Sequence, residues 1–146
     1  MSSMVQPTYD DVNLIMRLYE QRREEKMREA RDWFAKNMKV KSMEEFMKVA
    51  APGTPENAYF RQVTSYWEMV ASFVTSGVLN RDLFFQSGME LLFCWTRVRH
   101  ICGPLREAQQ NPKVWRNLES VASEMIGWLN RENPASYEAF VARIGG

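Results

Sequence analysis

Apolar residues recur at alternating steps of four and three through the middle of the chain, from Tyr59 to Leu105. Positions 59–73 carry this spacing, positions 84–105 carry it again, and Gly77–Asn80 separates the two stretches. The period is typical of helices that pack along one seam. The pattern predicts a hairpin of two apolar helices, with the seam formed by Tyr59, Val63, Tyr66, Val70, Phe73, Phe84, Gly88, Leu91, Trp95, Val98, Cys102 and Leu105.

Cap signals place the remaining helices. Thr8 with Asp11, and Ser42 with Glu45, are capping boxes. Three further sites pair a cap residue with a proline at the first helical position: Thr54-Pro55, Asn111-Pro112 and Asn133-Pro134. Helices are therefore expected over about 8–37, 43–51, 55–76, 81–109, 112–131 and from 134 onward.

No stretch alternates in the way of a β-strand. The expected fold class is all-α, a bundle of four main helices with one or two short additional helices. We expect a flexible N-terminus over 1–7 and a single helical domain over 8–146.

Three positions interrupt the helical pattern. The run Glu20–Lys26 has no apolar residue, so the helix over 8–37 either breaks near Arg22 or projects its first half onto another surface. Gly88 lies on the seam of the helix over 81–109, where it is expected to allow close approach. Pro104 removes one backbone hydrogen bond and is expected to kink or split that helix near Ile101.

Composition narrows the class of protein. With 146 residues, 45% of them hydrophobic and 12% aromatic, the chain has ample material for one globular core. Its formal net charge of +1 argues against strong non-specific attraction to nucleic acid. No apolar run approaches the ~18 residues that span a bilayer, and the N-terminus has no signal-peptide pattern, so a cytoplasmic protein without a membrane span is expected.

The residue types of common catalytic and metal sites are sparse. His100 is the only histidine, and no Glu-x-x-His motif exists. Cys94 and Cys102 are expected to be reduced and buried, because eight residues of helix set them about 12 Å apart. We therefore expect no catalytic residues, no metal and no cofactor.

A cluster of cationic residues on the second hairpin helix could bind an anion: Arg97, Arg99, His100 and Arg106. The alternative is a solvated face on which arginine stems cover aromatic rings. Glu68 follows Trp67 on an apolar helix, and an ion pair with Arg97 or Arg99 is expected for it rather than a catalytic role.

Methionine is abundant, with 10 residues, and Met-rich surfaces make adaptable binding sites. A possible interface gathers Met27, Trp33, Phe34, Met38, Met43, Phe46 and Met47. The alternative is that these residues form the lid of the core. A second apolar group on the first helix comprises Val12, Ile15, Met16 and Tyr19.

The pattern favours a non-enzymatic helical interaction module that self-associates as a homodimer, with the long first helix and the Met43–Met47 helix as its contact surface. A protein partner is possible. Two alternatives remain: a weak nucleic-acid or anion binder that uses the arginine cluster, and a small-ligand carrier with a pocket between the hairpin helices near Gly88.

The segments 27–34 (MREARDWF), 66–85 (YWEMVASFVTSGVLNRDLFF) and 101–107 (ICGPLRE) resemble a family of small bacterial helical proteins of unknown function. The matching positions are Trp67, Glu68, Ala71, Gly77, Val78 and Asp82, and the resemblance covers about 27–130. It implies a helical fold and a bacterial source, and no known activity. The N-terminal membrane helix of many members is not carried over.

Overall fold

The computed structural model describes residues 5–145, which fold into helices joined by short loops. The order is α1 (Tyr9–Arg22), α2 (Glu25–Asn37), α3 (Met43–Val49), α4 (Pro55–Thr75), α5 (Arg81–Phe85), α6 (Met89–Ala108), α7 (Arg116–Glu132) and α8 (Ser136–Ile144). The described part contains no strand, so the expected all-α bundle is confirmed. Of the expected flexible segment 1–7, residues 1–4 lie outside the described part.

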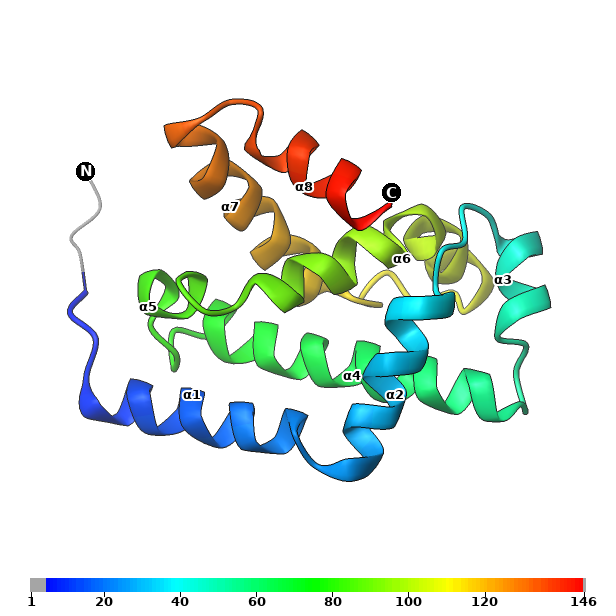
Figure 1. Cartoon of the computed structure of the whole chain (residues 1–146), viewed down its shortest axis with the longest axis horizontal. Coiled ribbons are helices and arrows are strands. Elements are labelled where there is room, and N and C mark those ends of the chain that lie inside the picture. The colour runs from blue at the N-terminus through cyan, green and yellow to red at the C-terminus, as the bar shows by residue number, and fades with distance from the viewer. Residues whose placement is uncertain (1–4, 146) are drawn as a thin grey trace.

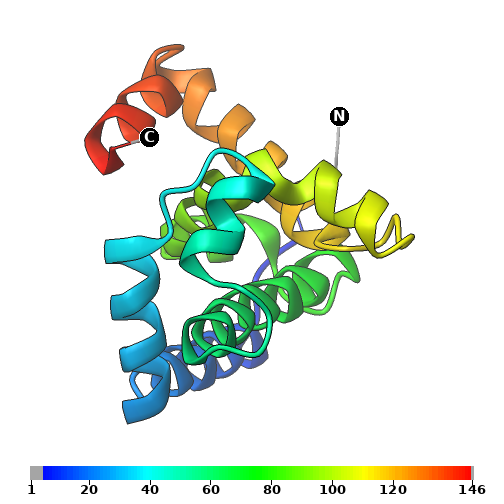
Figure 2. The ribbon, with the colours of Figure 1, turned by 90° about the vertical axis from the view of Figure 1, so that its right-hand side faces the viewer.

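Helix α4 is the centre of the arrangement. It packs most extensively against α7 on one side and α2 on the other. Figure 1 shows α1 running along one edge of the molecule beside α4, while α7 and α8 form the opposite edge. Figure 2, turned by 90°, shows the same separation, with α6 between the two edges.

Each helix contributes to one apolar core. The predicted seams are buried in part, since Val70, Leu91 and Val98 are fully buried. Tyr59, Phe73, Trp95 and Leu105 are only partly buried. Helices α1, α3 and α8 contribute one buried apolar residue each, Leu18, Phe46 and Phe140. The core therefore belongs to α2, α4, α6 and α7, and α1 lies at its margin.

Most of the predicted helix starts are confirmed by their caps. Thr8 and Asp11 form the expected capping box of α1. The side chains of Ser42, Thr54 and Asn80 each accept a hydrogen bond from the backbone amide three residues later, at 3.1, 3.1 and 2.9 Å. These starts are encoded locally, which is why the sequence reveals them.

The expected helix over 8–37 is broken after Arg22. Glu24 adopts an extended backbone (φ −62°, ψ 144°), and its carboxylate accepts a hydrogen bond from the amide of Met27 at 3.2 Å. This use of Glu24 as the cap of α2 replaces the ion pair with Arg28 that i,i+4 spacing favours. Of the two alternatives for this segment, the break near Arg22 is correct.

The expected continuous helix over 81–109 is wrong, because α5 ends at Phe85 and α6 begins at Met89. Gly88 lies at this break, as the residue before α6. A Cβ placed on it would lie 2.5 Å from the Phe84 ring and 2.8 Å from the Phe84 carbonyl oxygen. Its close contact is thus with the preceding turn rather than with a neighbouring helix. Pro104 does not split the helix, since α6 continues through it to Ala108.

The expected helix start at Asn111-Pro112 is also wrong. The Asn111 side chain accepts a hydrogen bond from the amide of Lys113 at 3.0 Å, which forms a turn. Helix α7 begins only at Arg116, after Trp115 in the left-handed region (φ 53°). No side chain of the loop caps α7, so its first amides need a partner from elsewhere in the fold.

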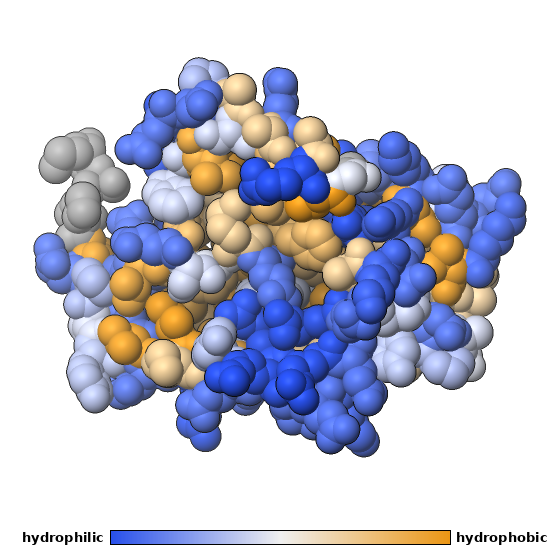
Figure 3. Space-filling model, in the orientation of Figure 1, coloured by the Kyte–Doolittle hydropathy of each residue, from blue (hydrophilic) through white to orange (hydrophobic). Residues whose placement is uncertain are grey.

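Polar and apolar residues gather on different parts of the surface (Figure 3). In Figure 3, strongly polar surface covers the junction of α1 and α2, where the Glu20–Lys26 run lies. Apolar surface gathers beside it, towards the end of the molecule that carries α1 and α5.

Candidate functional site

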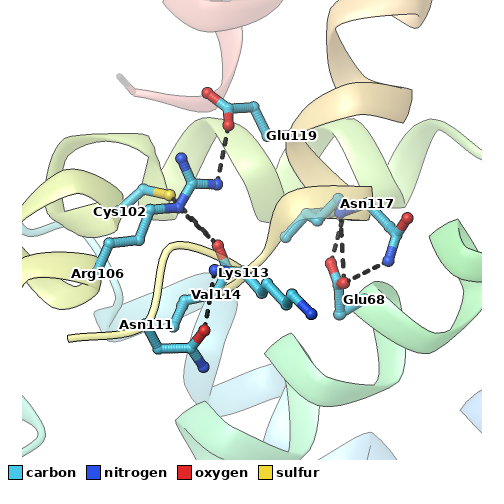
Figure 4. Close-up of polar contacts among 9 residues, drawn as sticks. Glu68, Cys102, Arg106, Asn111, Lys113, Val114, Asn117 and Glu119 are labelled. Carbon is cyan, nitrogen blue, oxygen red and sulfur yellow. Dashed lines mark hydrogen bonds and ion pairs between the residues drawn. The ribbon is translucent and has the colours of Figure 1, made fainter. Parts of the chain in front are cut away.

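Glu68, on α4, supplies the missing cap of α7. Its carboxylate accepts hydrogen bonds from the backbone amides of Asn117 and Leu118, at 3.3 and 2.8 Å, and from the Asn117 side chain at 2.8 Å. Figure 4 shows the carboxylate directed at the first turn of α7. A negative charge is favourable there, because the amino end of a helix carries a partial positive charge.

This arrangement corrects the expectation for Glu68. Its partner is a helix terminus, and neither Arg97 nor Arg99 pairs with it among the described contacts. The carboxylate accepts three hydrogen bonds, so Glu68 acts as a helix cap that comes from a distant part of the same chain. Glu68 thereby fixes α7 on α4, the most extensive contact between helices in the fold.

Arg106 fastens the other side of the same loop. Its Nε donates to the Val114 carbonyl oxygen at 2.9 Å, and its Nη2 pairs with Glu119 at 2.9 Å. The Cys102 thiol approaches the same carbonyl at 3.9 Å, as Figure 4 shows. Arg106 is thus engaged in holding the α6–α7 loop against α6 and α7.

Arg97 is almost completely buried, with 5% of its surface exposed. It donates to the carbonyl oxygens of Ala35 and Met38, both at 3.1 Å, and of Ile144 at 2.8 Å. These oxygens lie at the carboxyl ends of α2 and α8, where a cation is favourable. Its guanidinium also lies 4.6 Å from the centre of the Phe93 ring, and burial lowers its pKa.

The four cationic residues of the predicted anion patch therefore do not share one surface. Arg97 is buried, and Arg106 bonds to the α6–α7 loop. Arg99 donates to the carbonyl oxygen of Thr96 on the same helix. His100 is exposed, and its pKa is lowered by partial burial and by the neighbouring charges of Arg99 and Lys41. The charges beside His100 come from two segments: Lys41 lies in the loop before α3, and Arg99 lies on α6.

The predicted methionine-rich interface lies largely inside the molecule. Met27, Phe34, Met38 and Phe46 are each at most 4% exposed. Trp33 and Met43 are half-buried against the core, and Met47 alone is exposed. In this structure the group serves mainly as the lid of the core, the alternative that the sequence left open.

A second polar cluster joins α1, α2 and α6. Glu90 pairs with Arg31 at 2.6 and 2.7 Å and with Arg22 at 3.3 Å. Arg31 also donates to the carbonyl oxygen of Arg22 at 3.0 Å, which closes the end of α1. The hydrogen bonds with Glu90 raise the pKa of Arg31. The cluster fixes the angle between α1 and α2 at their break.

Between α1, α4 and the α5–α6 junction lies a cavity of about 20 Å³, lined among others by Ile15, Trp67 and Gly88. Small-molecule sites typically enclose about 300 Å³ or more, so this cavity near Gly88 is too small for a metabolite. A groove of about 480 Å³ between α2 and α6 is open to solvent, and the Arg31–Glu90 ion pair lies in its wall.

The two cysteine thiols are buried and weakly nucleophilic. Cys94 and Cys102 are free and buried, and burial raises the pKa of both thiols. A thiol with a raised pKa is protonated at neutral pH and is a weak nucleophile. Among residues 5–145, no three histidine, cysteine, aspartate or glutamate residues are grouped as metal ligands would be.

The sequence indicates the first helix as a contact surface, but it was the structure that identified which side of α1 is exposed. We call it the α1 stripe: Tyr9 (79% exposed), Val12 (45%), Met16 (52%) and Tyr19 (43%). The other apolar residues of the helix, Leu14, Ile15 and Leu18, face the core. The signal was present, because a helical wheel separates Val12 and Met16 from Leu18 by roughly 120–160°. The group taken from the sequence, Val12, Ile15, Met16 and Tyr19, combined three exposed residues with Ile15, which packs against the core.

Comparison with known proteins gives a family and no function. A family model described as a domain of unknown function (DUF4760) matches residues 7–125, from just before α1 to the middle of α7. No curated protein and no solved structure matches the chain. In the part of the chain that the structure describes, no helix combines the length and apolarity needed to cross a bilayer.

Proposed function

The chain belongs to the DUF4760 family, and we propose that it is a non-enzymatic helical interaction module that self-associates through the α1 stripe. The observation that carries this proposal is the exposure of four large apolar side chains at consecutive four-three positions of one helix. Contiguous apolar surface of this kind, rimmed by polar residues, marks interaction sites. Asn13 and Glu20, both exposed, form that rim.

The bonds made by four charged side chains support the same proposal. Glu68, Arg97 and Arg106 bond to helix ends and loop carbonyls, and Glu90 bonds to two arginines. These are the groups from which a polar site would otherwise be built, and each stabilises the fold. The free, buried cysteines also suit a reducing compartment such as the bacterial cytoplasm that we propose for it.

The test is light scattering over a dilution series, with wild type and two variants of α1. Met16→Glu places a charge in the stripe, and Gln21→Glu adds the same charge to another exposed position of the helix. We expect wild type and Gln21→Glu to pass from dimer to monomer on dilution, and Met16→Glu to be monomeric throughout. A wild-type protein that stays monomeric at high concentration would overturn the proposal.

A further inference from the structure

The inner side of α1 covers part of the core on α4. Leu14, Ile15 and Leu18 face this core, and only Leu18 is buried among them. The guanidinium of Arg22 lies 5.4 Å from the centre of the Trp67 ring. The cavity of about 20 Å³ described above lies between α1 and α4, so the seat of α1 is incompletely filled. A helix held by few buried apolar contacts opens at a lower free energy than the rest of a fold.

The break between α1 and α2 has the features of a hinge. Arg23 and Glu24 separate the two helices, and Glu24 caps α2 with its own carboxylate. Helix α2 therefore keeps its first turn when α1 moves away. Arg22, at the hinge end of α1, is fastened by its ion pair with Glu90 at 3.3 Å and by the bond from Arg31 to its carbonyl oxygen at 3.0 Å. Hinges typically consist of a few residues at the end of an element that change their backbone dihedral angles.

The rest of α1 is fastened by three hydrogen bonds. At the end away from the hinge, the Asn80 backbone amide donates to Asp11 and the Asn80 side chain donates to the Val5 carbonyl oxygen, both at 2.8 Å. Between the two ends, the Tyr66 hydroxyl donates to the Leu18 carbonyl oxygen at 2.6 Å. The net contribution of such bonds is small, because water bonds to both partners when they separate. They hold α1 closed without preventing its release.

The closed position also leaves one polar group unsatisfied. The indole N–H of Trp67, a residue that is 2% exposed, makes no hydrogen bond among the described residues. A buried donor without an acceptor destabilises the state that buries it. We propose that α1 is a hinged lid, which opens as a unit about Arg23 and Glu24 while α2–α8 stay folded. Opening uncovers an apolar site formed by Tyr66, Trp67, Val70 and Phe84, which line the cavity beneath α1.

Hydrogen exchange of the whole chain tests the lid directly. The exchange of single amides is followed by NMR at low urea concentrations, in protein dilute enough to be monomeric by light scattering. We expect the amides of residues 13–22 to share one opening free energy that is lower than that of α4 and α7. It should also fall less steeply with urea, because opening the lid exposes less surface than unfolding the whole chain.

A change far from α1 separates lid opening from global unfolding. Val121, on α7, is fully buried, and Val121→Ala removes the same packing from the closed and the open form. Exchange in α1 should therefore be unchanged, while amides of α4 and α7 exchange about tenfold faster or more, since each lost methylene contributes about 0.8 kcal/mol. Acceleration of α1 by the same factor would overturn the proposal. If Val121→Ala does not fold, the urea dependence of wild type decides by itself.

Two tyrosine variants complete the design. Tyr66→Phe removes a bond that only the closed form makes, so exchange in α1 should become several-fold faster. Tyr137→Phe is the matched control, because its hydroxyl bonds to Thr96 at 2.9 Å on another side of the fold, and α1 should not respond to it. An α1 that is insensitive to Tyr66→Phe would contradict the lid. Rates that decrease gradually from the ends of α1 inward would indicate fraying and would also overturn it.

Discussion

Gln110 occupies a backbone conformation that suits glycine. With φ at 50°, it follows the cap of α6 in a Schellman motif, in which the amide of Asn111 donates to the Arg106 carbonyl oxygen at 2.9 Å and that of Gln110 to Glu107 at 3.1 Å. This position is commonly glycine, since a side chain there is strained. The exposed Gln110 side chain makes no described contact that offsets the strain.

Replacing this residue should stabilise the protein. We expect Gln110→Gly to raise the free energy of unfolding by about 0.5–1 kcal/mol, because it removes the strain of the left-handed conformation. Urea unfolding measures the effect. Gln109→Gly is the matched control: its φ is −89°, so glycine there should lower stability instead. Equal losses from both variants would contradict the prediction.

Asp11 gives stability that depends on pH. Hydrogen bonds from the backbone amides of Thr8 and Asn80 hold its pKa below the ordinary value of 3.8. A lowered pKa in the folded state means that the contribution is complete above about pH 4 and is lost as the pH falls further. The unfolding free energies of wild type and Asp11→Asn should therefore converge as the pH falls below about 4. A difference that stays constant over this range would show that the charge of Asp11 contributes nothing.

At the scale of helices, Gly88 lies at the junction between α5 and α6, where a side chain does not fit. We expect Gly88→Ala to destabilise the protein by about 1–3 kcal/mol, because the new methyl group meets the Phe84 carbonyl and the α5–α6 junction must shift. Gly127, inside α7, has no atom within 4 Å of the same added group. Gly127→Ala should therefore stabilise by about 0.5–1 kcal/mol. Thermal unfolding of both variants distinguishes a steric effect from a general response to alanine.

The elements that the sequence revealed are those whose signals are local. The starts of α1, α3, α4 and α5 follow from side chains that bond three residues ahead. The seams of α4 and α6 follow from periodicity. Asn111-Pro112 carries the same local signal but forms a turn. The cap of α7 comes instead from Glu68, which is 49 residues away along the chain from Asn117. A pattern search limited to neighbours along the chain cannot find such a partner.

The candidate site shows the same limit. The sequence predicts Arg97 to be a surface cation like Arg99. In the folded chain it is buried, because the carboxyl ends of α2 and α8 both accept hydrogen bonds from it. The sequence of the methionine group is compatible with a core and with an interface. The exposed fractions of its side chains in the structure distinguish the two. Only the α1 stripe was within reach of the sequence, through the angle between its residues and Leu18.

At the scale of the whole molecule, Arg97 joins segments that are far apart in the chain. It links α6 to the ends of α2 and α8, so its loss leaves carbonyl oxygens of both helices without their donor. We expect Arg97→Met to lower the free energy of unfolding by about 2–4 kcal/mol, since hydrogen bonds from charged groups contribute about 1.5–3 kcal/mol each and are not additive.

Hydrogen exchange locates the effect. Amides of α8 should exchange faster in Arg97→Met than in wild type, because α8 loses its bond to α6 through Ile144. Arg99→Met is the control, since Arg99 bonds only within its own helix among the described contacts. Unchanged protection of α8 in Arg97→Met would show that its remaining contacts, among them the hydrogen bond between the Thr96 and Tyr137 hydroxyls at 2.9 Å, are sufficient to hold it.

The cap that Glu68 provides also bears on the order in which the protein folds. Helix α7 has no side chain of its own loop to start it, and its first turn is completed by a residue on α4. Closing the long segment between them costs chain entropy before the contact is gained. We therefore expect the amino end of α7 to form late, after α4 is in place, because local helix formation alone does not supply this cap.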